Sequence, residues 1–141
     1  MNNPVVAVGT VEGERFVIER LAGSGGMSTV YRALDQKTGK PVAIKYLALR
    51  TSLQQEAARF MREIRILADL HHPGIVAYVH HGQSAAGLPY LVMEWLEGED
   101  LEHRLKRGPL SISQSVLLVK TVCSALQLLH SRGIVHRGIV S

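Results

Sequence analysis

The amino-acid sequence predicts an α+β fold, in which a five-stranded antiparallel sheet carries one helix and is followed by a short helix and one long helix. Three observations lead to this prediction. Short β-rich segments separated by tight turns occupy the first part of the chain, and short connections favour antiparallel pairing. A single stretch among them has its apolar residues at helical spacing. Beyond Gly98 the apolar residues follow the helical period.

Three strands are expected before the first helix. They cover residues 16–21, 29–34 and 41–47. The second and third strands are joined by a turn that Asp35 opens and Gly39 completes, because glycine adopts positive φ without strain. In the third strand Val42 and Ile44 alternate with Ala43 and Lys45, as expected for a strand whose two faces differ.

The first helix is expected over residues 53–70. Thr51 or Ser52 is placed to begin a capping box with the glutamines that follow. The apolar stripe of this helix comprises Ala57, Phe60, Met61, Ile64, Leu67 and Ala68. The last two strands of the sheet are expected over residues 75–80 and 89–94.

Two helices are expected after the sheet. The short one covers residues 101–106, and the long one runs from a cap at Ser111 or Ser113 to about Ser131. Gly133 is placed to close the long helix in a left-handed conformation. The apolar stripe of the long helix comprises Val116, Val119, Val122, Cys123, Leu126 and Leu129. Cys123 is therefore expected to be a small buried hydrophobe.

Composition limits the classes of function. The 141 residues are enough for one domain with a core, and with only 5% aromatics, aliphatic side chains are expected to build that core. The net charge of +4 comes from scattered basic residues, which argues against a nucleic-acid partner. The small basic cluster at residues 104–107 is interpreted as a solvated helix end. No uninterrupted apolar run reaches the roughly 18 residues of a membrane span, so no membrane segment is expected.

The cysteine and histidine residues give two further expectations. Cys123 is the only cysteine, which excludes an intramolecular disulfide and suits a cytoplasmic protein. The start of the chain lacks the pattern of a signal peptide. Two histidine pairs, at residues 71–72 and 80–81, raise the possibility of a metal site. Adjacent pairs rarely aim both rings at one ion, so no metal is expected there.

A glycine-rich loop lies between the first two strands, in the run Gly23-Ser24-Gly25-Gly26-Met27-Ser28-Thr29-Val30. Glycines let backbone N–H groups approach phosphate oxygens closely. The alternative is a plain hairpin turn. A dinucleotide fingerprint requires a following helix and a third glycine, but a strand follows here and Ser28 is in third place. A Walker A loop requires a lysine near its end, which this run lacks.

Lys45 lies among apolar strand residues, where an unpaired charge is costly. Two partners would suit its ammonium group: a nucleotide phosphate and a carboxylate. Glu63 lies on the next helix and could face the sheet. The alternative for Glu63 is a position on the solvent side, beside Arg59 or Arg62.

These features together resemble the protein kinase family, and the bacterial-type serine/threonine protein kinases in particular. The glycine loop is followed in order by Val42-Ala43-Ile44-Lys45, the helix with Glu63, the run Leu70-His71-His72-Pro73-Gly74-Ile75-Val76, and the run Leu91-Val92-Met93-Glu94-Trp95-Leu96-Glu97-Gly98. The resemblance extends from about residue 16 to residue 137. It implies a leader at 1–14, a kinase N-lobe with an αC-type helix and a hinge at 15–97, and a partial C-lobe at 98–141.

The resemblance also implies an ATP site. Its members would be Ala22, Gly23, Ser24, Gly25, Gly26, Met27, Ser28, Thr29, Val30, Ala43, Lys45, Glu63, Met93, Glu94, Leu96 and Asp100. The loop would cover the phosphates, Lys45 would hold the α- and β-phosphates, and Glu63 would orient Lys45. Val30 and Ala43 would sandwich the adenine. Met93 would be the gatekeeper.

The hinge backbone and one carboxylate complete that expected site. The backbone of Glu94 and Leu96 would hydrogen-bond the adenine edge. Asp100 would reach the ribose hydroxyls, and a helix-cap role is the alternative for Asp100.

The pattern departs from the family in the catalytic loop. His136 and Arg137 match it, but Gly138 stands where the family has its catalytic aspartate. Glycine cannot accept a proton from a substrate hydroxyl. The intact family also uses Mg²⁺, whose protein ligands would follow the last residue of this chain. The chain alone is therefore expected to bind ATP and to lack transferase activity.

Two other functions remain open from the sequence. One is a pseudokinase-like module that binds a protein partner, and the other is a kinase completed by another chain. Apolar residues of the long helix are expected to lack cover, which favours self-association through this part of the chain.

Overall fold

The computed structural model describes residues 6–25, 28–47 and 53–133 of the chain. These residues form two compact units, which are described separately below. The first unit comes from Met1–Leu70 and Ala77–Trp95, and the second comes from His71–Val76 and Leu96–Ser141.

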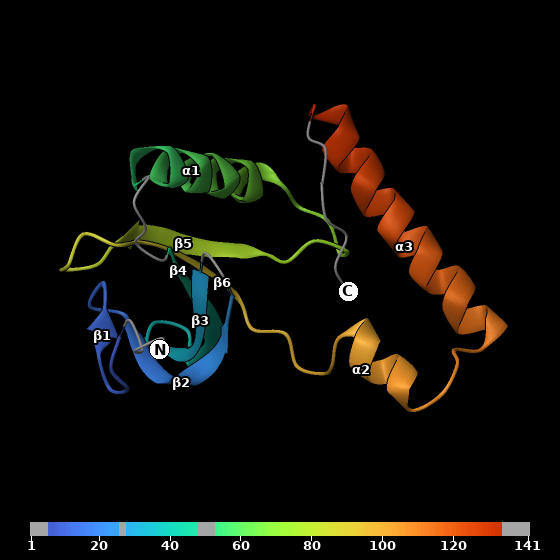
Figure 1. Ribbon diagram of the computed structural model, residues 1–141, viewed down its shortest axis with the longest axis horizontal. Helices are drawn as coiled ribbons and strands as arrows, with labels where there is room; N and C mark the ends of the chain where they lie inside the picture. Colours follow the sequence, from blue (N-terminus) through green and yellow to red (C-terminus); the bar gives the residue numbers. More distant parts are fainter. Residues whose placement is uncertain (1–5, 26–27, 48–52, 134–141) are drawn as a thin grey trace. The chain divides into compact units, whose positions relative to one another are not determined.

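The first unit is built on a six-stranded antiparallel sheet with strand order β1-β2-β3-β4-β6-β5 (Figure 1). Its strands are β1 (Val11–Glu12), β2 (Phe16–Ser24), β3 (Ser28–Asp35), β4 (Lys40–Leu47), β5 (Tyr78–Gln83) and β6 (Pro89–Glu94). Five of these strands were expected, and the α+β class is confirmed. Consecutive strands of the β2–β3–β4 meander are joined by short turns, which is the connection that antiparallel pairing allows.

The sixth strand, β1, lies in the segment expected to be a leader. It pairs with β2, and Glu12 is only 8% exposed. The hydroxyl of Tyr46 donates a hydrogen bond to Oε1 of Glu12 at 3.1 Å. Burial raises the pKa of Tyr46, so the hydroxyl keeps its proton and stays a donor. A strand of two residues held by one distant tyrosine has no periodic signal, which is why the sequence did not reveal it.

Strand β5 begins at Tyr78, three residues later than expected. The residues before it bond differently from strand residues. The N–H of Ile75 donates to the carbonyl of His72 at 3.0 Å, which forms a turn. The N–H of Ala77 donates to the carboxylate of Glu94 at 2.9 Å. These local partners replace the ladder bonds that would have extended the strand.

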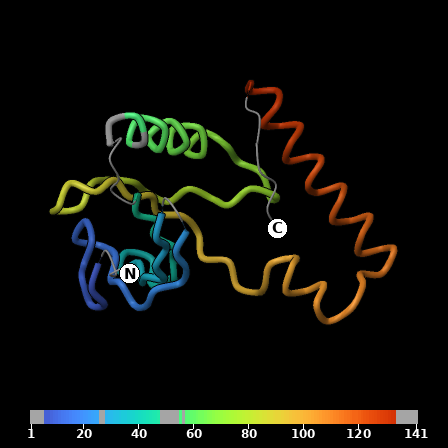
Figure 2. The backbone as a smooth tube through the Cα atoms, in the orientation of Figure 1, coloured from blue at the N-terminus to red at the C-terminus, as the bar shows by residue number. Residues whose placement is uncertain are grey.

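Helix α1 (Leu53–Asp69) packs on one face of the sheet. Phe60 and Ile64 are buried against Leu47 and Leu91 of the sheet. Figures 1 and 2 both show α1 running beside the β5–β6 side of the sheet. The predicted stripe of α1 is confirmed at five of its six positions, since Ala57, Met61 and Leu67 also pack against this cluster. The expected caps at Thr51 and Ser52 lie outside the described residues.

The other face of the sheet has an aromatic core, contrary to the expectation of a purely aliphatic one. Tyr31, Tyr46 and Phe16 are at most 1% exposed. The Tyr31 and Tyr46 rings meet edge to face with centroids 5.8 Å apart, and Tyr46 and Tyr90 lie 5.7 Å apart. Although aromatic residues are few, several of them occupy this one cluster, because alternate positions of β3, β4 and β6 point to the same face.

Gly82 in β5 is required by the ring of Tyr90. A Cβ at this position would lie 2.7 Å from the Tyr90 hydroxyl and 2.9 Å from its Cζ atom. We therefore expect Gly82→Ala to lower the free energy of unfolding by about 1–3 kcal/mol, because the buried ring must move. Urea denaturation measures this change. Gly23→Ala is the matched control, since a Cβ there meets nothing within 4 Å. Equal stability of Gly82→Ala and wild type would contradict the packing argument.

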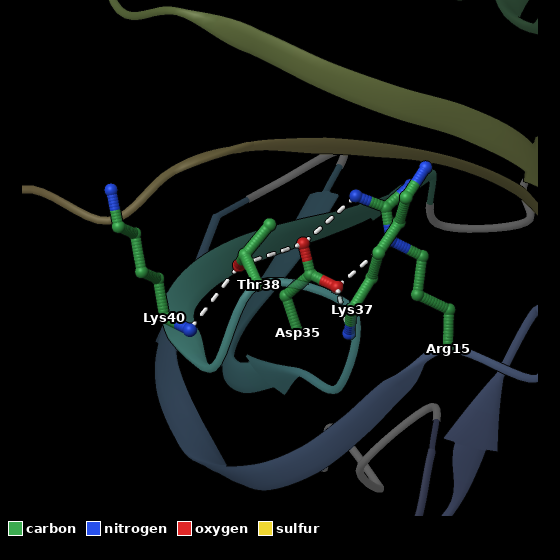
Figure 3. Close-up of polar contacts among 5 residues, drawn as sticks. All are labelled: Arg15, Asp35, Lys37, Thr38 and Lys40. Atoms are coloured by element: carbon green, nitrogen blue, oxygen red, sulfur yellow. Dashed lines mark hydrogen bonds and ion pairs between the residues drawn. The ribbon is translucent and has the colours of Figure 1, made fainter.

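A buried ion pair fixes the turn between β3 and β4. Arg15 donates from Nε and Nη2 to the two carboxylate oxygens of Asp35, each at 2.8 Å (Figure 3). The N–H of Lys37 and the hydroxyl of Thr38 also donate to this carboxylate. The Arg15 hydrogen bonds hold the pKa of Asp35 at about 2, against the effect of burial. The turn closes at Gly39 with φ of +73°, as the sequence predicted.

The second unit contains helices α2 (Leu101–Lys106) and α3 (Ile112–Ser131), both close to their expected bounds. Ser111 caps α3, and Ser111 and Gln114 form a reciprocal capping box. Gly133 follows the last turn with φ of +74°, as expected. The side chain of His72 joins the loop of this unit to α3, with its Nε2 atom 2.8 Å from the Ser124 hydroxyl.

Helix α3 is more exposed than its apolar composition suggests. Among its described residues only Ala125 is buried, while Leu117 is 67% exposed. Cys123 is exposed, so the expectation of a buried cysteine was wrong. Of the described residues, α3 alone is long and apolar enough to cross a membrane, by length and composition only. Lys120 and several small polar residues divide its apolar positions, so no uninterrupted apolar run marks it in the sequence. Core helices of soluble proteins meet the same criterion.

Candidate functional site

Four of the expected nucleotide residues lie on the sheet face that α1 also covers. Strand pairing places Val30 opposite Lys45, and Ala43 opposite Met93. Directly paired residues of antiparallel strands point to the same side, and so do residues two positions apart. Val30, Ala43, Lys45 and Met93 therefore share one face. The resemblance assigned all four to one nucleotide site, and that assignment stays a prediction.

The glycine loop connects β2 and β3 at one end of this face. Gly23 pairs with Val30 and Ser24 pairs with Thr29, and the N–H of Gly25 donates to the carbonyl of Ser28 at 2.8 Å. An irregularity in the pairing falls between Leu21 and Gly23, at the exposed residue Ala22. Ser28, Thr29 and Val30 are half-buried. Gly26 and Met27 lie outside the described residues.

Neither packing nor backbone conformation requires glycine at positions 23 and 25. A Cβ at Gly23 or at Gly25 would meet nothing within 4 Å, and neither residue has a positive φ. Both contrast with Gly82, whose neighbour leaves no room for a side chain. What glycine does provide at such positions is close approach of a ligand to the backbone of the loop.

Lys45 is half-buried in β4 beside α1. Its Nζ atom lies 6.0 Å from the centroid of the Phe60 ring. The ion pairs found among the described residues involve other side chains, so the ammonium group has no carboxylate partner there. A half-buried cation without a counterion is a suitable place for an anionic ligand.

The structure does not bring Glu63 to Lys45. Glu63 is exposed on α1, whereas its neighbour Ile64 is 1% exposed and faces the sheet. This position agrees with the solvent-side alternative. The pairing of Glu63 with Lys45 stays a prediction for a nucleotide-bound protein.

The last residue of β6, Glu94, is held by two hydrogen bonds to Ala77. The N–H of Glu94 donates to the Ala77 carbonyl, and Oε1 of Glu94 accepts from the Ala77 N–H, both at 2.9 Å. The position of Glu94 on the sheet edge is thus fixed on two sides. Met93, the expected gatekeeper, precedes it and is half-buried against the α1 cluster.

Two expected site residues belong to the second unit. Leu96 is 67% exposed. Asp100 caps α2: its Oδ1 atom accepts from the His103 N–H at 2.8 Å and lies 2.6 Å from His103 Nδ1. The hydrogen bond from the His103 backbone lowers the pKa of Asp100, and the Asp100 carboxylate raises the pKa of His103. The helix-cap alternative for Asp100 is what the structure contains, while the ribose role stays a prediction.

The catalytic loop and the two histidine pairs complete the list of residues considered from the sequence. His136, Arg137 and Gly138 of the catalytic loop lie outside the described residues. Within the described part of the chain, histidine, cysteine and acidic residues form no group of three that could hold a metal ion. His72 instead accepts from the Gly74 N–H at 2.8 Å, and His81 lies 2.6 Å from the Tyr78 hydroxyl.

Three side chains beside this face were not identified from the sequence. The guanidinium carbons of Arg20 and Arg32 lie 5.3 Å and 5.5 Å from the ring centroid of Trp95. Arg20 and Arg32 are cross-strand partners in β2 and β3. An irregularity between Ile18 and Arg20 shifts the strand register, so simple alternation could not have paired these two arginines.

Comparison with known proteins gives a consistent picture. The model of the protein kinase domain matches residues 16–139. The chain is 38% identical over 138 residues to the serine/threonine-protein kinase PknA of Mycobacterium tuberculosis, covering 94% of this chain and 32% of PknA. It is 37% identical over 133 residues to the serine/threonine-protein kinase PknB of Mycobacterium leprae, covering 89% of this chain and 21% of PknB.

A solved structure agrees with these sequence similarities. The kinase domain of PknI from Mycobacterium tuberculosis superimposes with a TM-score of 0.78 at 27% identity. The match covers 96% of this chain and 55% of that domain chain. The chain thus spans about half the length of the solved PknI chain. It spans about a third of the length of PknA and about a fifth of the length of PknB.

Proposed function

Because this chain belongs to the protein kinase family, we propose that it binds ATP on the sheet face formed by Val30, Ala43 and Lys45, beneath the glycine loop. The observation that carries this proposal is the loop itself. Gly23 and Gly25 have room for side chains and no need of positive φ, yet both are glycine. Through Val30, Gly23 is also one strand away from Lys45, whose ammonium group pairs with no carboxylate among the described residues. A phosphate chain is the ligand that uses both features.

The residues present suit the parts of the nucleotide. The Lys45 ammonium would bind the α- and β-phosphates, and the loop N–H groups would contact the phosphates from above. Ala43 and Val30 offer a small apolar surface for adenine, and the backbone of Glu94 ends the neighbouring strand β6. When bound, ATP would supply the phosphoryl group that the family transfers. The similar mycobacterial proteins are serine/threonine-protein kinases, and we assign this chain to the same class of kinase domain.

We also propose that this chain does not itself transfer phosphate. Gly138 stands where the family has the aspartate that accepts the proton of the substrate hydroxyl. A positioned general base contributes typically about 10²- to 10⁴-fold to the rate. Glycine has no group that could replace it.

A titration of the 141-residue chain with ATP tests the proposed binding, and a phosphate-transfer assay tests the proposed lack of activity. We expect calorimetry to detect saturable ATP binding, with and without magnesium. We expect no transfer of radiolabelled phosphate to a generic serine/threonine substrate or to the chain itself. Absence of ATP binding would contradict the first proposal, and measurable transfer that disappears in Lys45→Ala would contradict the second.

One observation favours a second function. The apolar face of α3 is exposed at Val116, Leu117 and Val119. Exposed apolar patches mark interaction sites in many proteins. The alternative is therefore a pseudokinase-like module that binds a protein partner and for which ATP is dispensable. ATP binding that is weak and unchanged in Lys45→Ala would favour this alternative.

A further inference from the structure

The arrangement of Arg20, Arg32 and Trp95 deepens the proposed ATP site and rests on that proposed function. Arg20 and Arg32 lie directly opposite each other on neighbouring strands. Like charges placed directly opposite on a sheet repel one another. The described structure contains two features that offset this repulsion: both guanidinium groups lie near the indole of Trp95, and Arg32 forms an ion pair with Glu19.

The indole ring suits two cations at once. The faces of an aromatic ring carry negative charge density, and tryptophan binds cations better than the other aromatic residues. The two guanidinium carbons lie 5.3 Å and 5.5 Å from the ring centroid, within the range of about 6 Å over which this attraction acts. Trp95 is half-buried, so these contacts are partly shielded from water.

The position of Trp95 in the chain gives this arrangement a role. Trp95 directly follows Glu94, and it is the last residue of the first unit. Arg32 pairs across the sheet with Ala43, one of the residues proposed to contact adenine. The contacts of Trp95 therefore connect strands β2 and β3, which carry the glycine loop, to the segment whose backbone is proposed to read the adenine edge.

The contacts on the other side of this segment complete the argument. Glu94 is held by its two hydrogen bonds to Ala77. Trp95 is held by Arg20 and Arg32. Two successive residues are thus attached to different parts of the sheet, so the backbone between them has little freedom to shift along the strand direction.

We propose that Arg20 and Arg32 are positioning residues that hold Trp95 and thereby fix the backbone at Glu94 for recognition of adenine. They act through Trp95 and do not contact the nucleotide themselves. The consequence is selectivity: a fixed backbone edge distinguishes adenine from guanine, because the exocyclic groups of the two bases present opposite hydrogen-bonding character. A backbone free to shift would accept either base more equally.

The test compares ATP and GTP binding to the 141-residue chain by calorimetry, with the ratio of the two dissociation constants as the readout. We expect Trp95→Leu to weaken ATP binding about fivefold, and GTP binding by less than about twofold, since two cation–π contacts are lost. Trp95→Phe keeps an aromatic face and is expected to stay within about twofold of wild type for both nucleotides. Arg20→Met keeps Trp95 and removes one contact, so it is expected to weaken ATP binding about twofold.

Arg65→Met, on the exposed side of α1, is the matched control and should leave both constants unchanged. An unchanged ATP-to-GTP ratio in Trp95→Leu, or an equal loss in Trp95→Phe, would overturn the inference. If wild type binds neither nucleotide, the proposed function itself is wrong. If Trp95→Leu does not fold, the Arg20→Met ratio decides, because that variant retains the ring.

Discussion

Replacing Lys45 with alanine is expected to weaken ATP binding by about 10- to 100-fold, while binding of adenosine stays within about twofold of wild type. Lys45 is half-buried, and within the described residues its ammonium group has no carboxylate partner. In the proposed complex it donates charge-assisted hydrogen bonds to phosphate oxygens. Such bonds contribute about 1.5–3 kcal/mol each, which sets the size of the effect.

Lys40→Ala is the control for this experiment. Lys40 is exposed and begins the same strand, β4, so its replacement removes an equal charge from the same element. The backbone N–H of Lys40 donates to the Thr38 hydroxyl, and alanine preserves that bond. Calorimetric titration of both variants with ATP and with adenosine gives four constants. An equal loss of ATP affinity in the two variants would show that Lys45 contributes only general electrostatic attraction. That result would contradict the proposal that Lys45 binds the phosphates directly.

Adenosine separates the two halves of the proposed site. It lacks the phosphates that Lys45 would hold, so its affinity depends on the apolar surface and the backbone edge. Loss of adenosine binding in Lys45→Ala would therefore indicate that the variant disturbs the sheet rather than the phosphate contact. A thermal unfolding midpoint measured for each variant identifies such a disturbance directly.

The strands and helices were largely predictable because their signals are local. Asp35 and Gly39 mark the turn between β3 and β4, and a serine cap marks the start of α3, where the structure selects Ser111 over Ser113. Each of these depends on residues at most four positions apart. The glycine loop and Lys45 were identified for a similar reason. The loop is a short run of glycines between two strands, and Lys45 ends a run of apolar strand residues.

The features that the sequence missed depend on distant partners. Strand β1 is held by the bond from Tyr46 to Glu12, which are far apart in the chain. The Trp95 contacts depend on a strand irregularity that shifts the register near Arg20. For Glu63, helical spacing allowed either side of α1, and only the packing of Ile64 selected the exposed one. Local patterns do not determine such relations between elements.

Asp35→Asn is expected to lower the free energy of unfolding by about 2–3 kcal/mol at neutral pH. Asp35 is 1% exposed and accepts two hydrogen bonds from Arg15. Removing one member of a fully buried ion pair costs about 3–5 kcal/mol. The Arg15 side chain is 25% exposed, so water can solvate it in the variant, and the expected cost of about 2–3 kcal/mol lies below that range.

Glu99→Gln is the matched control, because it removes a carboxylate from the exposed ion pair with Arg107. Exposed pairs contribute about 0–1 kcal/mol, so this variant should remain close to wild type. Urea denaturation of the three proteins measures the difference. Equal losses in Asp35→Asn and Glu99→Gln would show that burial of the Asp35 pair has no energetic consequence.

The loss of stability in Asp35→Asn is expected to depend on pH, and its sign follows from the pKa of Asp35. The folded value of about 2 lies below the ordinary value of 3.8, so the folded protein releases this proton more readily than the unfolded chain. The carboxylate therefore stabilises the fold fully above the ordinary value, and the stabilisation is lost as the pH falls toward 2. We expect the difference in unfolding free energy between wild type and Asp35→Asn to shrink by about 1 kcal/mol from pH 6 to pH 3. A difference that stays constant or grows over this interval would exclude the ion pair as its cause, since no other group changes between the two proteins.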